Sequence, residues 1–207
     1  KNKNVKLLGE HPLVAYTIFA AKKAGIFTDI ILSSDNETYA AIARYYGANV
    51  PFLRPPEFAT STSPDIEWVS YTLRRLAKEG NQFDCFSILR PTSPFRTSET
   101  IRRAWRQFLG NTQFDSLRAV EKCSQHPGKM WVLTDSGMKP LLEQPKEGPP
   151  FHSQQFAALP TIYVQNASLE IAWSRVALEE NSISGKKLFP FFTDELEGTD
   201  LNNESDW

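Results

Sequence analysis

The segment Arg90-Pro91-Thr92-Ser93-Pro94 places a guanidinium and two hydroxyls between prolines. A guanidinium can bind a carboxylate or a phosphate through two hydrogen bonds, and hydroxyl and backbone N–H groups donate to anionic oxygens. Arg96 adds a second cation, and the prolines lower the entropy that binding would cost. The segment is therefore a candidate anion-binding loop. A tight turn whose Ser and Thr residues cap the next helix is an equally open interpretation.

Cationic and amide side chains occur at two other places. Lys3 and Asn4 precede a predicted helix and could meet phosphates, although a frayed, solvated terminus has the same composition. Arg54 follows a predicted strand and is held by Pro55. It is a candidate ligand contact, with a surface ion pair as the alternative.

Acidic residues gather in the segment "EGTDLNNESDW", which contains Asp200, Glu204 and Asp206. Mg²⁺ prefers oxygen ligands, often one or two carboxylates together with substrate phosphates. The segment is a candidate metal site, and a solvated acidic tail is the alternative.

The elements that would position these residues alternate between helix and strand. Hydrophobic spacing and end signals predict helices over 13–24, 36–46, 65–78 and 98–109, and strands over 29–35, 49–53 and 83–89. This alternation predicts an α/β fold, with a mostly parallel sheet and helices on both faces. Ligands bind beyond the carboxyl ends of such strands, so the polar loops that follow them should meet at one edge.

Length and composition fit a single domain spanning 1–207, because 207 residues with 41% apolar side chains can bury a sizeable core. Residues 121–165 are rich in Pro, Gly and Gln, which indicates an inserted β-rich arm. The net charge of −1 argues against a nucleic-acid partner. No apolar run reaches the ~18 residues of a membrane span, and two cysteines fit a reducing cytoplasm.

Six segments occur in the order found in cytidylyltransferases for nonulosonic acids: "KNKNVKLLGEHPLVAYTI", "ILSSDNETYAAIARYYGANVPFLRP", "LRPTSPFRTSETI", "HPGKMW", "LPTIYVQNASLEI" and "TDLNNESDW". The chain thus resembles, over nearly its whole length, the N-acylneuraminate cytidylyltransferase (CMP-sialic acid synthetase) family. The resemblance implies a nucleotidyltransferase-type, Rossmann-like domain with a dimerisation arm at 121–165, and hence a homodimer. It also implies Mg²⁺-dependent transfer of CMP from CTP to a nine-carbon keto sugar acid, with release of pyrophosphate, for glycan or cell-surface polysaccharide synthesis.

The resemblance also assigns residues. Lys3 would meet the phosphates and act in catalysis, Asn4 the ribose, and Arg54 and Ser63 the base. Asp200, as a catalytic residue, and Asn202 would bind the metal. The sugar acid would lie against Arg90, Thr92, Ser93, Lys129, Tyr163 and Asn166.

Several positions depart from the family pattern. The phosphate loop Arg-x-Gly-Ser-Lys is expected before Lys1, Arg90 stands where the family has Gln, and Ala167 stands where it has Gly. Asn202 replaces an acid, which leaves Asp206 or Asp35 as candidates for the second carboxylate. These departures bear on the sugar more than on the nucleotide.

Two other functions are consistent with the sequence. One is a non-catalytic module that binds a nucleotide or a sugar acid on the same scaffold. The other is a nucleotidyltransferase for a neutral sugar that uses another nucleoside triphosphate.

Overall fold

The computed structural model of the chain describes residues 2–207, which form two compact units. Unit 1 comprises the residues up to Val120 together with Gln165–Trp207, and unit 2 is Glu121–Val164. The helices are α1 (Leu13–Ala24), α2 (Glu37–Tyr46), α3 (Asp65–Lys78), α4 (Ser98–Leu109) and α5 (Ser174–Glu179). The strands are β1 (Leu7–Leu8), β2 (His11–Pro12), β3 (Cys85–Ile88), β4 (Ser116–Lys122), β5 (Trp131–Thr134), β6 (Gly137–Pro140), β7 (Tyr163–Trp173) and β8 (Leu188–Phe192).

The predicted helices form where the end signals placed them. The Asn36 side chain caps α2 by accepting a hydrogen bond from the Tyr39 N–H at 3.2 Å, and Gly47 ends that helix with a φ of 91°. Thr97 and Thr100 form a reciprocal capping box at the start of α4. Local capping therefore fixes the starts of both helices.

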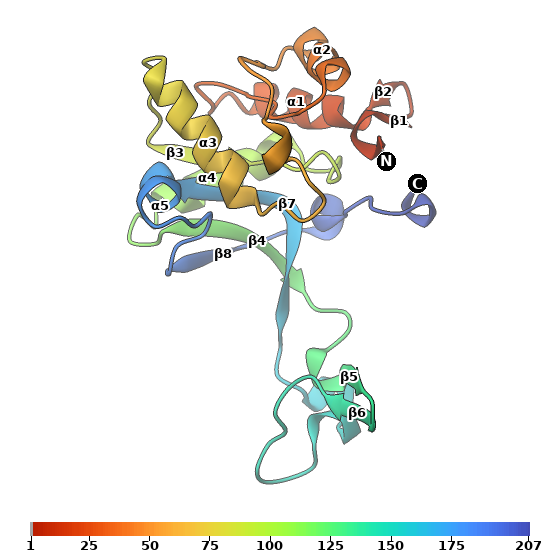
Figure 1. Cartoon of the computed structure of the whole chain (residues 1–207). Helices are drawn as coiled ribbons and strands as arrows, with labels where there is room; N and C mark the ends of the chain where they lie inside the picture. Colours follow the sequence, from red (N-terminus) through yellow and green to blue (C-terminus); the bar gives the residue numbers. More distant parts are fainter. Residues whose placement is uncertain (1) are drawn as a thin grey trace. The chain divides into compact units, whose positions relative to one another are not determined.

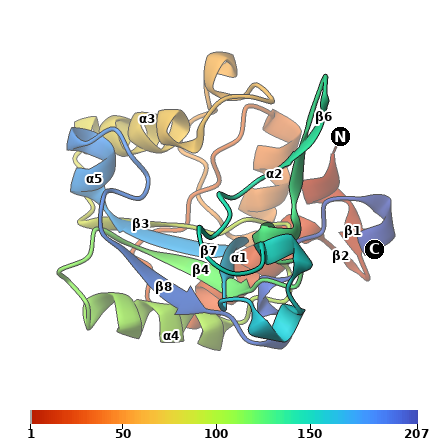
Figure 2. The ribbon, with the colours of Figure 1, turned by 90° about the horizontal axis from the view of Figure 1, so that it is seen from below.

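The central sheet has the strand order β3-β7-β4-β8 (Figure 1). Figure 2 shows α3 and α5 on one face of this sheet and α4 on the other, which confirms the predicted α/β class. The expectation of a mostly parallel sheet needs correction, because β3 and β7 pair antiparallel while β4 and β8 pair parallel. β7 follows the 121–164 insert rather than a crossover helix, so nothing requires it to run parallel to β3.

The two strands predicted over 29–35 and 49–53 are reduced to one parallel bridge, between Ile31 and Asn49. Backbone bonds from Leu32 N to Asn49 O (2.9 Å) and from Asn49 N to Ile30 O (2.7 Å) flank the bridge. Pro51 has no N–H to donate, so the ladder cannot extend beyond this point.

Two apolar clusters cover the two faces of the sheet. One joins α4 to the strands and includes Phe108, Leu117, Leu169, Ile171 and Phe191. The other joins α3, β3 and α5 and includes Val69, Leu73, Ile88 and Ala177. Because side chains alternate along a strand, Arg118 and Glu170 lie on the face opposite to α4.

A cavity of about 690 Å³ lies among segment 26–33, α3 and β3 and is lined mainly by apolar side chains. None of the residues predicted to bind substrate lines it. The predicted substrate-binding residues therefore lie outside this cavity.

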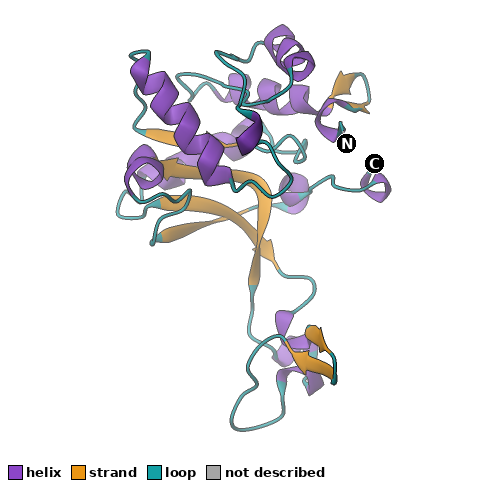
Figure 3. Ribbon diagram, viewed as in Figure 1, coloured by secondary structure: helices purple, strands orange, loops and turns teal. Residues whose placement is uncertain are grey.

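Unit 2 contains one hairpin, in which Trp131 pairs with Pro140 and Thr134 with Gly137, together with three short 3-10 turns (Figure 3). Lys129 lies in the first of these turns, and its Nζ donates to the carbonyls of His152 (3.2 Å) and Gln154 (2.7 Å). No helix among residues 2–207 is both long and apolar enough to cross a membrane.

Candidate functional site

The loop of residues 90–94 connects β3 to α4 and buries its hydroxyls. Thr92 and Ser93 are 6% and 1% exposed, and the Ser93 N–H donates to the Arg90 carbonyl at 3.2 Å in a tight turn. The tight turn of the alternative interpretation is therefore confirmed, but its capping role is wrong for these two residues, because Thr97 caps α4. The Ser93 Oγ is buried without a hydrogen-bond partner. Such an atom is costly unless another group satisfies it, so Ser93 Oγ is a candidate hydrogen-bonding group for a ligand.

The acidic segment lies directly against this loop. The Leu201 N–H donates to the Thr92 carbonyl at 2.8 Å, and the Leu201 side chain is buried. This contact places Asp200 and Asn202, on either side of Leu201, next to the candidate anion-binding loop. The two ends of unit 1 come together here, as the N and C labels in Figure 1 show.

Lys3, Asn202 and Asp200 form a hydrogen-bonded series that we call the Asp200 chain. Lys3 Nζ donates to Asn202 Oδ1 at 2.7 Å, and Asn202 Nδ2 donates to Asp200 Oδ2 at 2.6 Å. The other oxygen of Asp200, Oδ1, is buried without a partner. Three residues that the family resemblance assigns to phosphate and metal thus lie together, and one oxygen of the Asp200 carboxylate has no hydrogen-bond partner.

Asp206, rather than Asp35, supports this chain. Its Oδ2 accepts the N–H groups of Asn202 (2.7 Å) and Asn203 (2.8 Å), and these backbone hydrogen bonds hold the pKa of Asp206 below its ordinary value. Asp35 instead contributes to the electrostatic surroundings of Arg54. Of the two candidates for the second carboxylate, Asp206 is the one beside Asn202.

Arg54 joins two of the predicted polar loops. Its Nε donates to Ser33 Oγ at 3.0 Å, its Nη2 donates to the Ser33 carbonyl at 2.6 Å, and its guanidinium lies 4.9 Å from the Trp68 ring centroid. Burial lowers the pKa of Arg54. Ser63 makes local contacts, with its Oγ donating to the Glu57 carbonyl at 3.1 Å, and Asn4 is exposed beside Lys3.

Arg90 lies in a set of charged groups that we call the Arg90 network: Arg90, Asp65, Glu170 and Arg118. The Arg90 Nη2 is 2.5 Å from Asp65 Oδ2 and 3.2 Å from Glu170 Oε1. Arg118 Nη2 lies 3.0 Å from Glu170 Oε2. Sequence reasoning missed Asp65 and Glu170 as partners of Arg90, and Arg118 as the second partner of Glu170. The available signal was a glutamate inside the apolar run of β7.

Arg96 lies beneath the loop instead of facing a ligand. It is 2% exposed, and it donates to the Ser168 carbonyl, to Thr17 Oγ1 (2.9 Å) and to the Arg90 carbonyl (3.2 Å). Burial lowers the pKa of Arg96 to about 9, so it keeps its proton at neutral pH. Because it binds the carbonyl of Arg90, it fixes the start of the loop.

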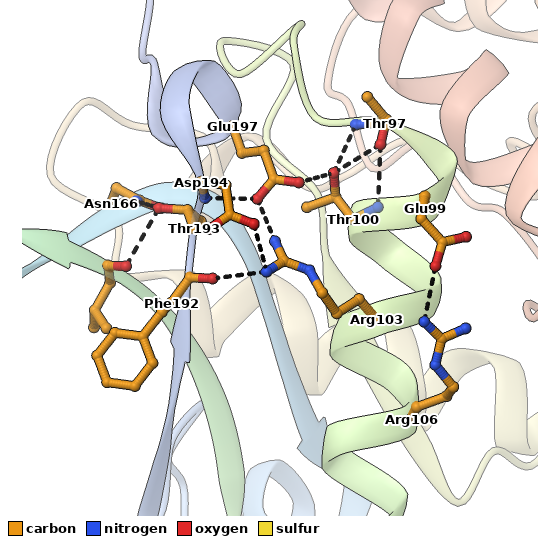
Figure 4. A network of polar contacts seen from close by, with 11 residues as sticks. Thr97, Glu99, Thr100, Arg103, Arg106, Asn166, Phe192, Thr193, Asp194 and Glu197 are labelled. Atoms are coloured by element: carbon orange, nitrogen blue, oxygen red, sulfur yellow. Dashed lines mark hydrogen bonds and ion pairs between the residues drawn. The ribbon is translucent and has the colours of Figure 1, made fainter.

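A further network holds the segment that leads to Asp200 (Figure 4). Glu197 accepts hydrogen bonds from Thr100 Oγ1 (2.5 Å) and from Arg103, so residues 195–198 are tied to α4. Asn166 Nδ2 donates to Thr193 Oγ1 at 2.8 Å, and the Thr193 hydroxyl donates to the Val120 carbonyl at 3.3 Å.

Not all of the predicted sugar-binding residues lie in the same unit. Asn166 belongs to unit 1, whereas Lys129 and Tyr163 belong to unit 2. A contact of these three residues with the sugar acid stays a prediction.

Several known proteins are similar to this chain in sequence. A family profile described as Cytidylyltransferase matches residues 1–129. A protein of Legionella pneumophila named CMP-N,N'-diacetyllegionaminic acid synthase is 32% identical over 99% of this chain and 86% of its own length. An Escherichia coli N-acylneuraminate cytidylyltransferase is 40% identical over 60% of this chain and 29% of its own length.

The fold also resembles a solved structure, that of CMP:2-keto-3-deoxy-manno-octonic acid synthetase complexed with CTP. The TM-score is 0.63 at 8% identity, over 92% of this chain and 83% of the other. This likeness defines a nucleotidyltransferase-type α/β fold. The profile and the relatives confirm the resemblance drawn from the sequence: the chain belongs to the cytidylyltransferase family, a family of nucleotidyltransferase enzymes.

Proposed function

We propose that this chain transfers CMP from CTP to a nonulosonic acid, a nine-carbon 2-keto sugar acid, and releases pyrophosphate in a Mg²⁺-dependent reaction. The observation that carries the proposal is the Asp200 chain, bonded to the 90–94 loop through Leu201 N and Thr92 O. The names of the Legionella and E. coli relatives, which both refer to such acids, support it.

The reaction requires little covalent chemistry from the protein. The anomeric oxygen of the sugar acid forms a bond to the α-phosphorus, the bond from that phosphorus to the bridging oxygen breaks, and pyrophosphate leaves. The proton of the attacking hydroxyl passes to solvent. Positioning the reactants and neutralising their charge supply most of the rate in reactions of this kind.

The nucleotide phosphates would lie between Lys3 and Asp200. Lys3 carries a positive charge, and its hydrogen bond to a neutral amide oxygen can be exchanged for one to a phosphate oxygen at low cost. The buried hydroxyl groups of Thr92 and Ser93 in the adjoining loop would face the sugar acid.

A magnesium ion fits this arrangement through Asp200. Among residues 2–207 no three His, Cys, Asp or Glu side chains cluster to hold a metal alone, but Mg²⁺ bound to substrate phosphates needs only one or two protein carboxylates. Asp200 Oδ1 is a buried oxygen without a partner, whereas Asn202 Oδ1 already accepts from Lys3. When bound, the ion would neutralise negative charge on the triphosphate.

The test is pyrophosphate release with Mg²⁺, each of the four nucleoside triphosphates, and a panel of acids: N-acetylneuraminic, N,N'-diacetyllegionaminic and 2-keto-3-deoxy-manno-octonic acid. Release with CTP and one acid supports the proposal and identifies the substrate. CTP binding by calorimetry without release in any combination would favour the non-catalytic binding module. Release with another triphosphate and a neutral sugar would overturn the proposal.

Unit 2 is proposed to pair with a second copy of this chain. Its side chains include several exposed apolar ones, among them Leu133 at 82% and Met138 at 60% exposure. Apolar groups gathered at such exposure mark interaction surfaces. We expect light scattering to give a dimer mass that Leu133→Asp reduces to a monomer mass. A wild-type monomer would exclude the dimer.

Both cysteines are free thiols, as a reducing cytoplasm would keep them.

A further inference from the structure

We propose that Glu170 is a positioning residue for substrate specificity: it holds the Arg90 guanidinium where that group meets the carboxylate of the sugar acid. The inference rests on the proposed function and extends it to a residue that nothing else assigns. Glu170 itself is 3% exposed, so it acts through Arg90 and does not touch the substrate.

The geometry of Glu170 connects three neighbouring strands. Its Oε1 lies 3.2 Å from Arg90, which follows β3, and its Oε2 lies 3.0 Å from Arg118 on β4. Its backbone carbonyl accepts a hydrogen bond from Ser87 Oγ on β3 at 2.8 Å. Glu170 is thus held by a hydrogen bond at Oε1 and at its backbone carbonyl, and its Oε2 lies within ion-pair distance of Arg118 without a hydrogen bond.

The Arg90 guanidinium is held through one of its two terminal nitrogens. Its two carboxylate contacts, with Asp65 and Glu170, both use the same terminal nitrogen, Nη2, and its side chain remains 34% exposed. Its backbone carbonyl is held by Arg96. Since a guanidinium has five N–H groups in a planar fork, engaging one nitrogen orients the others without exhausting them.

Glu170 also explains how a cation can occupy position 90, where the family pattern has Gln. Buried charges are tolerated when they are paired. Arg90 and Arg118 contribute two positive charges to the network, and Asp65 and Glu170 contribute two negative charges. Replacing Glu170 would leave Arg118, whose side chain is 12% exposed, without its carboxylate.

The experiment is steady-state kinetics of Glu170→Gln with CTP and whichever panel acid supports turnover of the wild type. A positioning role and a purely electrostatic role of Glu170 predict changes of opposite sign in KM for the sugar acid. Loss of a negative charge near the site would strengthen binding of an anionic substrate, whereas loss of the bond that orients Arg90 weakens it. We expect KM for the sugar acid to rise about 10-fold and KM for CTP to change less than about 2-fold. A lower or unchanged KM for the sugar acid would overturn the inference.

A matched control separates this role from stability alone. Asp115 is also a buried acid paired with an arginine, with its Oδ1 2.7 Å from Arg175 Nη2, and it lies at the start of β4, outside the candidate site. We expect Asp115→Asn to lower the melting temperature and leave both KM values unchanged. If it raises the sugar KM as Glu170→Gln does, the role of Glu170 is structural.

The methyl ester of the same acid supplies a second readout, because it lacks the charge that Arg90 would bind. The Glu170→Gln effect should disappear with the ester, and an equal effect on acid and ester would contradict the inference. If Glu170→Gln does not fold, the double variant with Arg118→Gln removes the unpaired cation and is tested in the same way. Absence of wild-type turnover would count against the proposed function, whereas normal wild-type turnover with an unaffected variant would count against this inference alone.

Discussion

The Asp200 chain and the Arg90 network flank the same loop, but they hold their charges in opposite ways. In the Asp200 chain, one carboxylate meets a neutral amide, and its second oxygen has no partner. In the Arg90 network, both oxygens of Glu170 lie within ion-pair distance of arginines, although Oε2 makes no hydrogen bond, and the cations match the acids in number. An open charge can take a ligand that is itself charged, whereas a balanced network resists change. The first arrangement suits phosphates that arrive and leave, and the second suits a group that must stay oriented.

The variant Asp200→Asn tests the Asp200 chain and should have the largest effect. We expect turnover to fall by about 10²-fold or more, because the open carboxylate oxygen is lost where charge must be neutralised. The fold should stay intact, since Asn at this position can still accept from Asn202. Pyrophosphate release across a Mg²⁺ titration, with a thermal melt beside it, measures both. Turnover retained at the wild-type level would remove Asp200 from the metal site.

Arg90→Ala tests the other region and should act on two properties together. We expect KM for the sugar acid to rise by about 10-fold or more while KM for CTP stays nearly constant, because one charge-assisted contact is lost. Stability should fall by about 1–3 kcal/mol, since Asp65 and Glu170 each lose a cation.

Denaturant titration and two-substrate kinetics measure these effects. Arg175→Ala, which removes the partner of Asp115, is the control: it should cost stability without changing either KM. Equal rises of the two KM values in Arg90→Ala would place Arg90 outside the sugar site.

A smaller effect is expected in the pH dependence of stability, which depends on Asp65 in the Arg90 network. Burial alone would raise the pKa of Asp65, but hydrogen bonds from Arg90 and Trp68 bring it below the ordinary value of 3.8. A lowered pKa means that Asp65 contributes stability above pH ~4, and this is lost as the pH falls through the folded-state value.

The melting temperatures of wild type and Asp65→Asn should therefore differ at neutral pH and converge as the pH falls below 3.8 and through the folded-state pKa of Asp65. Asp206 also has a lowered pKa, but its side chain lies at the surface, so Asp206→Asn should give a weaker convergence. A constant difference for Asp65→Asn across this range would show that its carboxylate does not stabilise the fold.

Much of the scaffold was predictable from local chemistry. The bounds of α3 and α4 followed from apolar spacing and end signals, and the meeting of polar loops at one edge followed from the α/β pattern. The hydrogen bonds from Arg54 to Ser33, which join two of these loops, agree with that pattern.

The Arg90 network was not predictable in the same way. Its members are adjacent only because β7 lies between β3 and β4, and strand order is not encoded in the spacing of residues along one element. Asp65 had an ordinary explanation as a first-turn residue of α3. The antiparallel pairing of β3 and β7 depends on the insert between β4 and β7, which local patterns do not describe.

The Asp200 chain joins residues that are 199 positions apart, and a neighbouring contact, from Lys6 Nζ to Glu204 Oε2, spans 198. The last strand of the sheet ends at Phe192, so the apolar cluster between the sheet and α4 can form before these contacts exist. Contacts of such long range close the largest loops in the chain and contribute little until the core has formed. We therefore expect the proposed phosphate and metal site to form after the core and to be lost early on local opening. A preparation can carry a well-formed core and a normal melt while a fraction of its molecules lacks the site.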